Sequence, residues 1–403
     1  MKPSRPKPSR LKATRRTTLA AALLALVLPL PIAAAGTAVA APAPAAAAVG
    51  APAQSIRLPR PTGPFAVGTD DLHLVDRQRQ DPWVPSAGPR QLMVSMYYPA
   101  LHDTGRPAPY MTTAAAQAFL DFNGLGGKLS ATELAAAKTY AATGARPAHG
   151  RFPLVVLSPG MEQPRAMLTG LAVDLASRGY VVAVVDHTYE NPGTTFPDGT
   201  TPGCVICNRP VPGGPTAIAD SRAQDLSFTI SQLTDHHSTW PYAELIDRQE
   251  IGVAGHSLGG AAALTTMAAD PRVRAGADLD GTFFTPVPAD GLAGRSFLLF
   301  GTQLDHNVGG SDPTWGSTYA ALTGWKEWLT VAGTVHASFT DVPILADAGG
   351  IPLLPQLTTP ARRGMQLTRD YLAAYFDQQL KGRPQPLLAG PNPADPEVSF
   401  QHP

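Results

Sequence analysis

The chain has 403 residues, and its 31 basic and 31 acidic side chains give it a formal net charge of zero. Seven of the basic residues and no acidic one lie within the first 40 positions, so the remainder carries a net charge of about −7. Nothing in this mildly acidic balance attracts nucleic acid or an anionic membrane surface, and the length allows one large α/β domain with insertions.

Residues 1–40 are predicted to be a secretory signal peptide, which implies a secreted, extracellular protein. A basic start is followed by the apolar run 19–32 and by a small-residue stop at 38–40. Pro29 and Pro31 interrupt the run, which is shorter than the ~20 residues needed to span a bilayer, so a membrane anchor is not predicted. The adjacent Arg15 and Arg16 fit both the twin-arginine export route and ordinary leader charge.

Residues 41–55 are predicted to be a linker, because alanine, proline and glycine dominate them and cannot build a core. The folded domain is expected over 56–403. It opens with two short strands of alternating polarity at 72–75 and 92–98, and Pro99 is expected to end the second one.

A helical insertion is predicted at 109–148, ahead of the first central strand, from its alanine-rich segments. Placed there, it could overhang the active-site edge as a lid and line it with Tyr110, Met111, Phe119 and Phe122. It could equally cap one end of the sheet, and the sequence leaves both arrangements open.

The rest of the domain alternates buried strands with helices. Apolar runs predict strands at 152–157, 181–185, 251–254, 275–279, 297–300 and 328–332, and helices are predicted at 167–177, 217–233, 260–267 and 365–380. Continuous apolar strands are typical of a parallel sheet with both faces covered. The fold class is therefore α/β, with a mostly parallel central sheet and helices on both of its faces.

The two cysteines of the chain, Cys204 and Cys207, are predicted to form a local disulfide. A zinc site would need four ligands, and an exported chain favours an oxidised pair. Because the closed ring is small, its effect on stability is expected to be local.

The strongest motif runs from Gly255 to Gly260, with Ser257 between Gly255 and Gly259. It lies between a predicted strand and a predicted helix, which is the context of the nucleophile elbow of an α/β-hydrolase fold. The flanking glycines allow a turn so tight that side chains there would clash. Ser257 is therefore the candidate nucleophile.

A serine hydroxyl needs a base within hydrogen-bond reach and a third group that orients the base. Of the histidines that follow Ser257, His336 comes directly after the predicted strand 328–332, where a loop can reach back to the elbow. His402 lies in the tail, and His306 is expected on a loop at the rim of the site. His336 is the candidate base.

Two aspartates could supply the orienting acid. Asp280 follows the strand after the elbow strand, and Asp305 follows the next strand along the chain. Either loop could approach the imidazole of His336, so these residues alone leave the acid open.

The chain resembles the plasma-type platelet-activating-factor acetylhydrolases and their bacterial relatives. The likeness rests on the elbow motif, on Asp280 some 23 positions after Ser257, on His336 in a short loop, and on the segment 152–160. It covers most of residues 90–385. In that family the acid follows the strand after the elbow, which implies Asp280, and an oxyanion hole is implied at the backbone amides of Met161 and Leu258.

The resemblance implies a serine carboxylic-ester hydrolase of short-chain acyl esters, including the sn-2 acyl group of platelet-activating-factor-like or oxidised phospholipids. Transient contact with a lipid surface is expected, and no metal or organic cofactor is required. Lipase, polyester hydrolase and peptidase activities use the same three side chains and remain alternatives. A non-catalytic secreted binding protein is disfavoured because all three side chains are present.

Two other features are interpreted as structural. Arg222 and Asp225, three residues apart on a predicted helix, are expected to form an ion pair. Asp186 and His187 end a central strand and are expected to be satisfied there.

Overall fold

The structure of the chain is a computed structural model, which describes residues 55–403. The predicted signal peptide and nearly all of the predicted linker lie outside the described residues. None of the described helices is long and apolar enough to cross a bilayer.

The domain is built around one mixed sheet, whose strands lie in the order β11-β10-β9-β8-β7-β5-β6-β2-β1-β4-β3. The six central strands are parallel to one another, as the apolar runs predicted. They are β5 (Phe152–Ser158), β6 (Val181–His187), β7 (Ile246–His256), β8 (Val273–Leu279), β9 (Ser296–Thr302) and β10 (Lys326–Val331).

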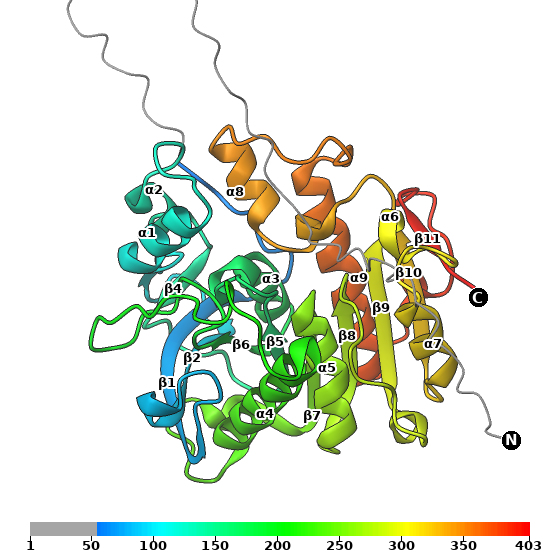
Figure 1. Ribbon diagram of the computed structural model, residues 1–403, viewed down its shortest axis with the longest axis horizontal. Helices are drawn as coiled ribbons and strands as arrows, with labels where there is room; N and C mark the ends of the chain where they lie inside the picture. Colours follow the sequence, from blue (N-terminus) through cyan, green and yellow to red (C-terminus); the bar gives the residue numbers. More distant parts are fainter. Residues whose placement is uncertain (1–54) are drawn as a thin grey trace, which may run out of the picture. The chain divides into compact units, whose positions relative to one another are not determined.

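Helices cover both faces of the sheet (Figure 1). On one face lie α4 (Gly214–Thr234) and α5 (Leu258–Ala269), and on the other α3 (Thr169–Ser177) and α9 (Ala361–Lys381). Neighbouring residues of β5 pack into opposite clusters, Val156 with the first pair of helices and Val155 with the second. Burial on both faces explains why the central strands are continuously apolar.

The strand order reverses at β5, which lies between β6 and β7. In open α/β sheets, ligands bind beyond the carboxyl ends of the strands at such a reversal. Ser158 ends β5 and His256 ends β7, so the elbow serine directly follows this point.

The two entry strands are longer than predicted. β1 (Ala66–Gln80) and β2 (Pro89–Ala100) form an antiparallel pair that continues through Pro99. The prediction that Pro99 ends the strand is wrong because Pro99 lies beyond Tyr97, the last residue of β2 that pairs with β6. Its missing N–H therefore breaks no bond to β6.

The insertion contains the predicted helices, α1 (Thr113–Phe122) and α2 (Ala131–Ala135). Its final part differs from the prediction, because β4 (Ala141–Thr143) joins the sheet beside β1 and pairs on its other side with β3 (Arg106–Pro107). The open edge of β1 provides the backbone partners for this addition.

Several short elements complete the carboxyl-terminal half. They are α6 (Gln303–His306), α7 (Thr314–Ala321), a 3-10 helix at His336–Phe339, α8 (Val342–Ala348) and the edge strand β11 (Val398–Phe400). Ile344 and Leu345 of α8 share an apolar cluster with Phe119 and Leu120 of α1. The insertion therefore packs against the segment that follows His336.

Candidate active site

Ser257 sits on a sharp turn between β7 and α5. Its backbone dihedrals, φ 56° and ψ −126°, lie in a region that residues other than glycine rarely adopt. A Cβ atom added to Gly255 would lie 2.2 Å from the carbonyl carbon of Gly259, and one added to Gly259 would lie 2.0 Å from the carbonyl oxygen of Ser158. Only glycine fits at these two positions, so they permit the turn that the motif predicted.

Asp280 and His336 are brought together from different strand ends. Asp280 directly follows β8 and is buried, while His336 starts the 3-10 helix after β10. The Nδ1 atom of His336 donates to Oδ2 of Asp280 at 2.7 Å. The side chain of His336 is 53% exposed, which leaves its other face open to a substrate.

The alternative acid and base lie elsewhere. The carboxylate of Asp305, in α6, accepts a hydrogen bond from the Ser311 hydroxyl at 3.0 Å. His402 is exposed in the tail. Neither makes a hydrogen bond to His336 among the described residues.

A second histidine shares Asp280. His306 Nδ1 donates to Oδ1 of Asp280 at 2.8 Å, and its Nε2 lies 3.4 Å from Asp312. The expectation that His306 lies on a rim loop is wrong, because its ring is buried and stacks on Trp315 at 4.0 Å between centroids.

The charges of this group follow from its hydrogen bonds. Although burial alone would lower it, the bonds to Asp280 and Asp312 raise the pKa of His306 to about 9. Burial alone would raise the pKa of Asp280, but the bonds from His306 and His336 hold it well below its usual range. His306 is therefore a cation and Asp280 an anion at neutral pH.

His256, inside the motif, supports the loop that carries His336. Its Nε2 atom donates to the carbonyl oxygen of His336 at 2.7 Å, and the two ring centroids are 4.5 Å apart. Burial lowers the pKa of His256 to about 3, so the ring is neutral. Sequence reasoning missed the roles of His256 and His306, although His256 stands next to the motif serine.

The loop after β5 passes directly over the elbow. A Cβ atom on Gly160 would lie 2.8 Å from Nδ1 of His256 and 3.3 Å from Cβ of Ser257. Met161 follows and packs against the apolar cluster that contains Leu258. Within residues 55–403, neither the Met161 amide nor the Leu258 amide donates to a protein acceptor. Both remain available to a ligand at the elbow.

The model of the family "Platelet-activating factor acetylhydrolase, isoform II" matches residues 50–197 and 227–351. The chain belongs to this family. It is a carboxylic-ester hydrolase with an α/β-hydrolase fold.

Named relatives and a solved structure agree with this assignment. The chain is 30% identical to a probable 1-alkyl-2-acetylglycerophosphocholine esterase of Arthroderma benhamiae, over 86% of this chain and 94% of the relative. It is 25% identical to the platelet-activating factor acetylhydrolase of Bos taurus, over 71% and 68% of the two chains. A ferulic acid esterase from Streptomyces cinnamoneus superposes with a TM-score of 0.77 and 42% identity, covering 86% of this chain and all of the esterase.

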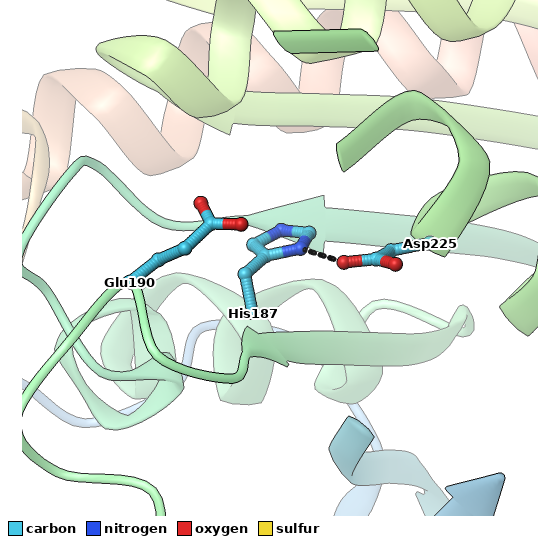
Figure 2. A group of neighbouring side chains, drawn as sticks. All are labelled: His187, Glu190 and Asp225. Atoms are coloured by element: carbon cyan, nitrogen blue, oxygen red, sulfur yellow. Dashed lines mark hydrogen bonds and ion pairs between the residues drawn. The ribbon is translucent and has the colours of Figure 1, made fainter. Parts of the chain in front are cut away.

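A buried cluster of side chains in this acetylhydrolase-family chain includes His187, Glu190 and Asp225 (Figure 2). Arg90 donates to Asp225 at 2.7 Å and to Glu190 at 3.3 Å, while Arg222 donates to Glu190 at 2.7 Å. Because these guanidinium groups occupy the carboxylate oxygens and repel a cation, the donor set fits an ion-pair network and not a metal ion.

The expected pair between Arg222 and Asp225 does not form. The two residues lie on α4 but face different partners: Arg222 pairs with Glu190, and Asp225 pairs with Arg79, Arg90 and His187. The helical spacing predicted that Arg222 and Asp225 lie close together. Charged side chains on neighbouring segments bind each of them instead.

Asp186 and His187, at the end of β6, are both hydrogen-bonded as expected, and they bond to different partners. Asp186 accepts from the backbone N–H of Arg165 at 2.6 Å and from its guanidinium group. His187 lies between Ser158 and Asp225.

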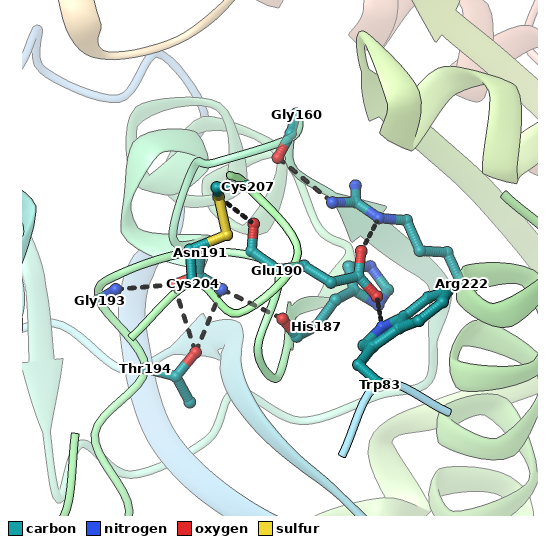
Figure 3. The surroundings of a disulfide bond; sticks show 10 residues. All are labelled: Trp83, Gly160, His187, Glu190, Asn191, Gly193, Thr194, Cys204, Cys207 and Arg222. Atoms are coloured by element: carbon teal, nitrogen blue, oxygen red, sulfur yellow. Dashed lines mark hydrogen bonds and ion pairs between the residues drawn. A yellow bond between two sulfur atoms is a disulfide. The ribbon is translucent and has the colours of Figure 1, made fainter. Parts of the chain in front are cut away.

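Cys204 and Cys207 are joined by a disulfide, with 5.5 Å between their Cα atoms. Figure 3 shows that the bridge lies beside Glu190, whose carbonyl oxygen is 3.9 Å from the Cys207 sulfur. Ile206, between the cysteines, is buried in the cluster that contains Leu258.

An apolar cavity of about 310 Å³ adjoins the loop 159–164, which follows β5. Met161 forms part of its wall, and the rest of the wall comes from the insertion, from α8 and from the segments beside them. The lining residues are Phe119, Leu120, Asn123, Leu125, Leu129, Leu134, Met161, Glu162, Gln163, Val342, Leu345, Ala346, Ile351 and Leu353.

Proposed function

We propose that this protein is an exported serine esterase in which Ser257 is the nucleophile, His336 the general base and Asp280 the orienting acid. The observation that carries the proposal is the hydrogen-bonded pair of Asp280 and half-exposed His336, joined to the elbow through the bond from His256 to the His336 carbonyl. The comparisons supply the reaction class, and the strained elbow supports Ser257 as its nucleophile.

The reaction proceeds through an acyl-enzyme. The Ser257 hydroxyl attacks the ester carbonyl while Nε2 of His336 takes its proton, and the imidazolium then gives that proton to the departing alcohol. Water attacks the acyl-serine with His336 again as the base, which releases the acid and restores the serine. These steps need no metal or organic cofactor.

Two groups stabilise charge during these steps. The anionic Asp280 bonds to Nδ1 of His336 and stabilises the imidazolium that forms. The free amides of Met161 and Leu258 donate to the oxygen that becomes negative. Removing one such donor costs about 10²–10³ in kcat in a well-studied serine protease.

The substrate is a small-molecule ester, and two acyl classes compete. Short acyl groups, including acetyl at the sn-2 position of a phospholipid, follow from the names of the relatives. Aromatic acyl groups follow from the ferulic acid esterase, which is the more similar in sequence at 42% identity. The apolar cavity beside Met161 can hold a group larger than acetyl and favours testing the aromatic class alongside the short acyl class.

The test is hydrolysis of p-nitrophenyl esters from acetate to palmitate, with methyl ferulate and a 2-acetyl ether phospholipid in parallel. We expect turnover of short esters, a loss of at least about 10³-fold in Ser257→Ala, and a large loss in Asp280→Asn. Asp305→Asn is the matched control and should retain wild-type activity.

Each alternative has its own outcome. A preference for palmitate would indicate a lipase, and a preference for methyl ferulate would indicate an aromatic-acid esterase. Activity that survives in Ser257→Ala would contradict the nucleophile, and a greater loss in Asp305→Asn than in Asp280→Asn would reassign the acid.

A further inference from the structure

A second Ser–His–Asp array lies under the proposed active site. The Ser158 hydroxyl is 2.8 Å from Nε2 of His187, and Nδ1 of His187 is 2.8 Å from Oδ2 of Asp225. Burial lowers the pKa of His187, so the ring is neutral, donates to Asp225 and accepts from Ser158. All three side chains are buried, and a substrate has no access to Ser158. The array therefore fixes the end of β5 and is not a second catalytic site.

Arg222 continues this network to the two residues that follow Ser158. Its Nη1 atom donates to the carbonyl oxygen of Pro159. Its Nη2 atom lies 3.5 Å from the carbonyl oxygen of Gly160 (Figure 3). Its Nε atom donates to Glu190 at 2.7 Å. One buried guanidinium group thus joins an ion pair to two successive peptide groups of the loop 159–164, which we call the oxyanion loop.

The same network holds the other side of Met161. The backbone amide of Glu162 donates to the carbonyl oxygen of Glu190 at 3.0 Å. The side chain of Glu190 also accepts from the Trp83 indole at 2.8 Å. Anchors on both sides leave the Met161 peptide little freedom to rotate.

The direction of the Met161 amide follows from the planarity of the peptide group. In a trans peptide, the carbonyl of Gly160 and the N–H of Met161 point in opposite directions. The Gly160 carbonyl accepts from Gln163 N at 3.3 Å and faces Arg222, so the Met161 N–H points away from the buried network.

We infer that Arg222 is a positioning residue for ester hydrolysis, which holds the Pro159–Gly160 segment so that the Met161 amide is directed at the developing oxyanion. The inference rests on the proposed function and adds to it a residue that does not touch the substrate. Arginine suits the task because its planar fork binds a carboxylate and two carbonyl groups at once.

The decisive variant is Arg222→Lys, which keeps the charge opposite Glu190 but cannot bond to several acceptors in the same fork geometry. We expect kcat for p-nitrophenyl acetate to fall about 10- to 100-fold, while KM changes less than about twofold, because a misdirected donor acts mainly on the transition state. The inhibition constant of a trifluoromethyl ketone, which forms a tetrahedral adduct with a catalytic serine, should rise in parallel.

The control is Arg178→Lys, in which a less buried ion-paired arginine, bonded to Asp174 and Asp370, is changed. It should leave kcat and the inhibition constant unchanged. Rates are expressed per active site, titrated with diethyl p-nitrophenyl phosphate, so that loss of folded protein does not imitate loss of turnover. If Arg222→Lys does not fold, Glu190→Gln, which keeps the shape of the arginine's partner, should show a smaller effect in the same direction.

The outcomes separate the two proposals. An unchanged kcat and inhibition constant in Arg222→Lys, with activity abolished in Ser257→Ala, would overturn the positioning role alone. A fall in kcat without a change in the inhibition constant would also overturn it, because the oxyanion contact would be intact. Activity that survives in Ser257→Ala would overturn the proposed function and this inference with it.

Discussion

His306 sets the charge around the proposed catalytic acid. Asp280 accepts from His336 on one oxygen and from His306 on the other, and the backbone N–H of Thr302 also donates to it. The positive charge of His306 would by itself cancel the negative charge of Asp280. Because Asp312 lies on the other side of His306, the group of three side chains keeps a net negative charge. The pH dependence of the enzyme should therefore respond to His306.

We predict that His306→Asn shifts the acid limb of the kcat/KM profile to higher pH. The amide can still donate to Asp280, but the positive charge beside the Asp280–His336 pair is gone, and the loss of a nearby positive charge favours the protonated form of a base. Other charged or titratable groups near His306 are Asp278 and Asp312, and both stay in place. The measurement is hydrolysis of p-nitrophenyl acetate from pH 5 to 11. An unchanged limb, as expected for the control Asp305→Asn, would show that His306 has no electrostatic role.

The same substitution should change how stability depends on pH. Because the pKa of His306 is raised from 6.5 to about 9 by folding, its contribution to stability is complete below pH 6.5 and is lost as pH rises through about 9. The melting temperature of the wild type should fall more between pH 6.5 and 10 than that of His306→Asn.

A motif or a strand end in the sequence is what marks a residue for prediction at this scale. Ser257 and His336 were placed by such signals, and their catalytic roles stay predictions until variants are tested. The choice between Asp280 and Asp305 needed family likeness, because which loop turns toward His336 depends on the backbone of Asp280, whose φ is 63°. His306 was misplaced because Trp315, which buries it, leaves no local pattern.

Among the structural elements, the disulfide segment connects the surface with the oxyanion loop. The amides of Val205 and Ile206 face the carbonyl oxygen of Tyr189, the neighbour of Glu190. The ring that the disulfide closes spans only a three-residue separation, so it removes little entropy from the unfolded chain.

We predict that reduction of the disulfide lowers kcat/KM several-fold while the melting temperature changes by only about 2 °C, since the bridge acts locally. The measurement is ester hydrolysis and thermal unfolding with and without dithiothreitol. The double variant Cys204→Ser/Cys207→Ser should show the reduced rate under both conditions. A fall in melting temperature without a kinetic effect would contradict this role.

Elements with a strong periodic or apolar signal were predictable, and edge elements were not. The six central strands are buried on both faces, which makes each of them an unbroken apolar run. By contrast, β4 and β11 have three residues each and exist because β1 and β10 offer them a free edge. Such pairing depends on the assembled sheet and leaves no pattern of its own in so short a segment.

For the whole chain, we propose export through the predicted signal peptide. A disulfide in the folded domain fits an oxidising compartment. Expressed as the full precursor in an export-competent bacterial host, the protein should appear outside the cytoplasm with its new N-terminus near Ala41, as measured by intact mass and N-terminal sequencing.

A second experiment tests which export pathway the protein uses. Replacing Arg15 and Arg16 by lysine should block export if the twin-arginine pathway is used and should leave it unchanged if the pair supplies only leader charge. Uncleaved precursor retained in the cytoplasm of the wild type would contradict export altogether.

The backbone is strained at two residues of the proposed active site. Ser257 and Asp280 both hold backbone conformations with positive φ, each of which costs about 1–3 kcal/mol against a typical stability of about 5–15 kcal/mol. At Ser257, glycine would relieve this cost, whereas at Asp280 it would also remove the bonds from His306 and His336. Selection for stability alone would therefore favour the loss of the Ser257 side chain, so a more stable descendant chosen without regard to turnover would tend to be a well-folded protein that hydrolyses nothing.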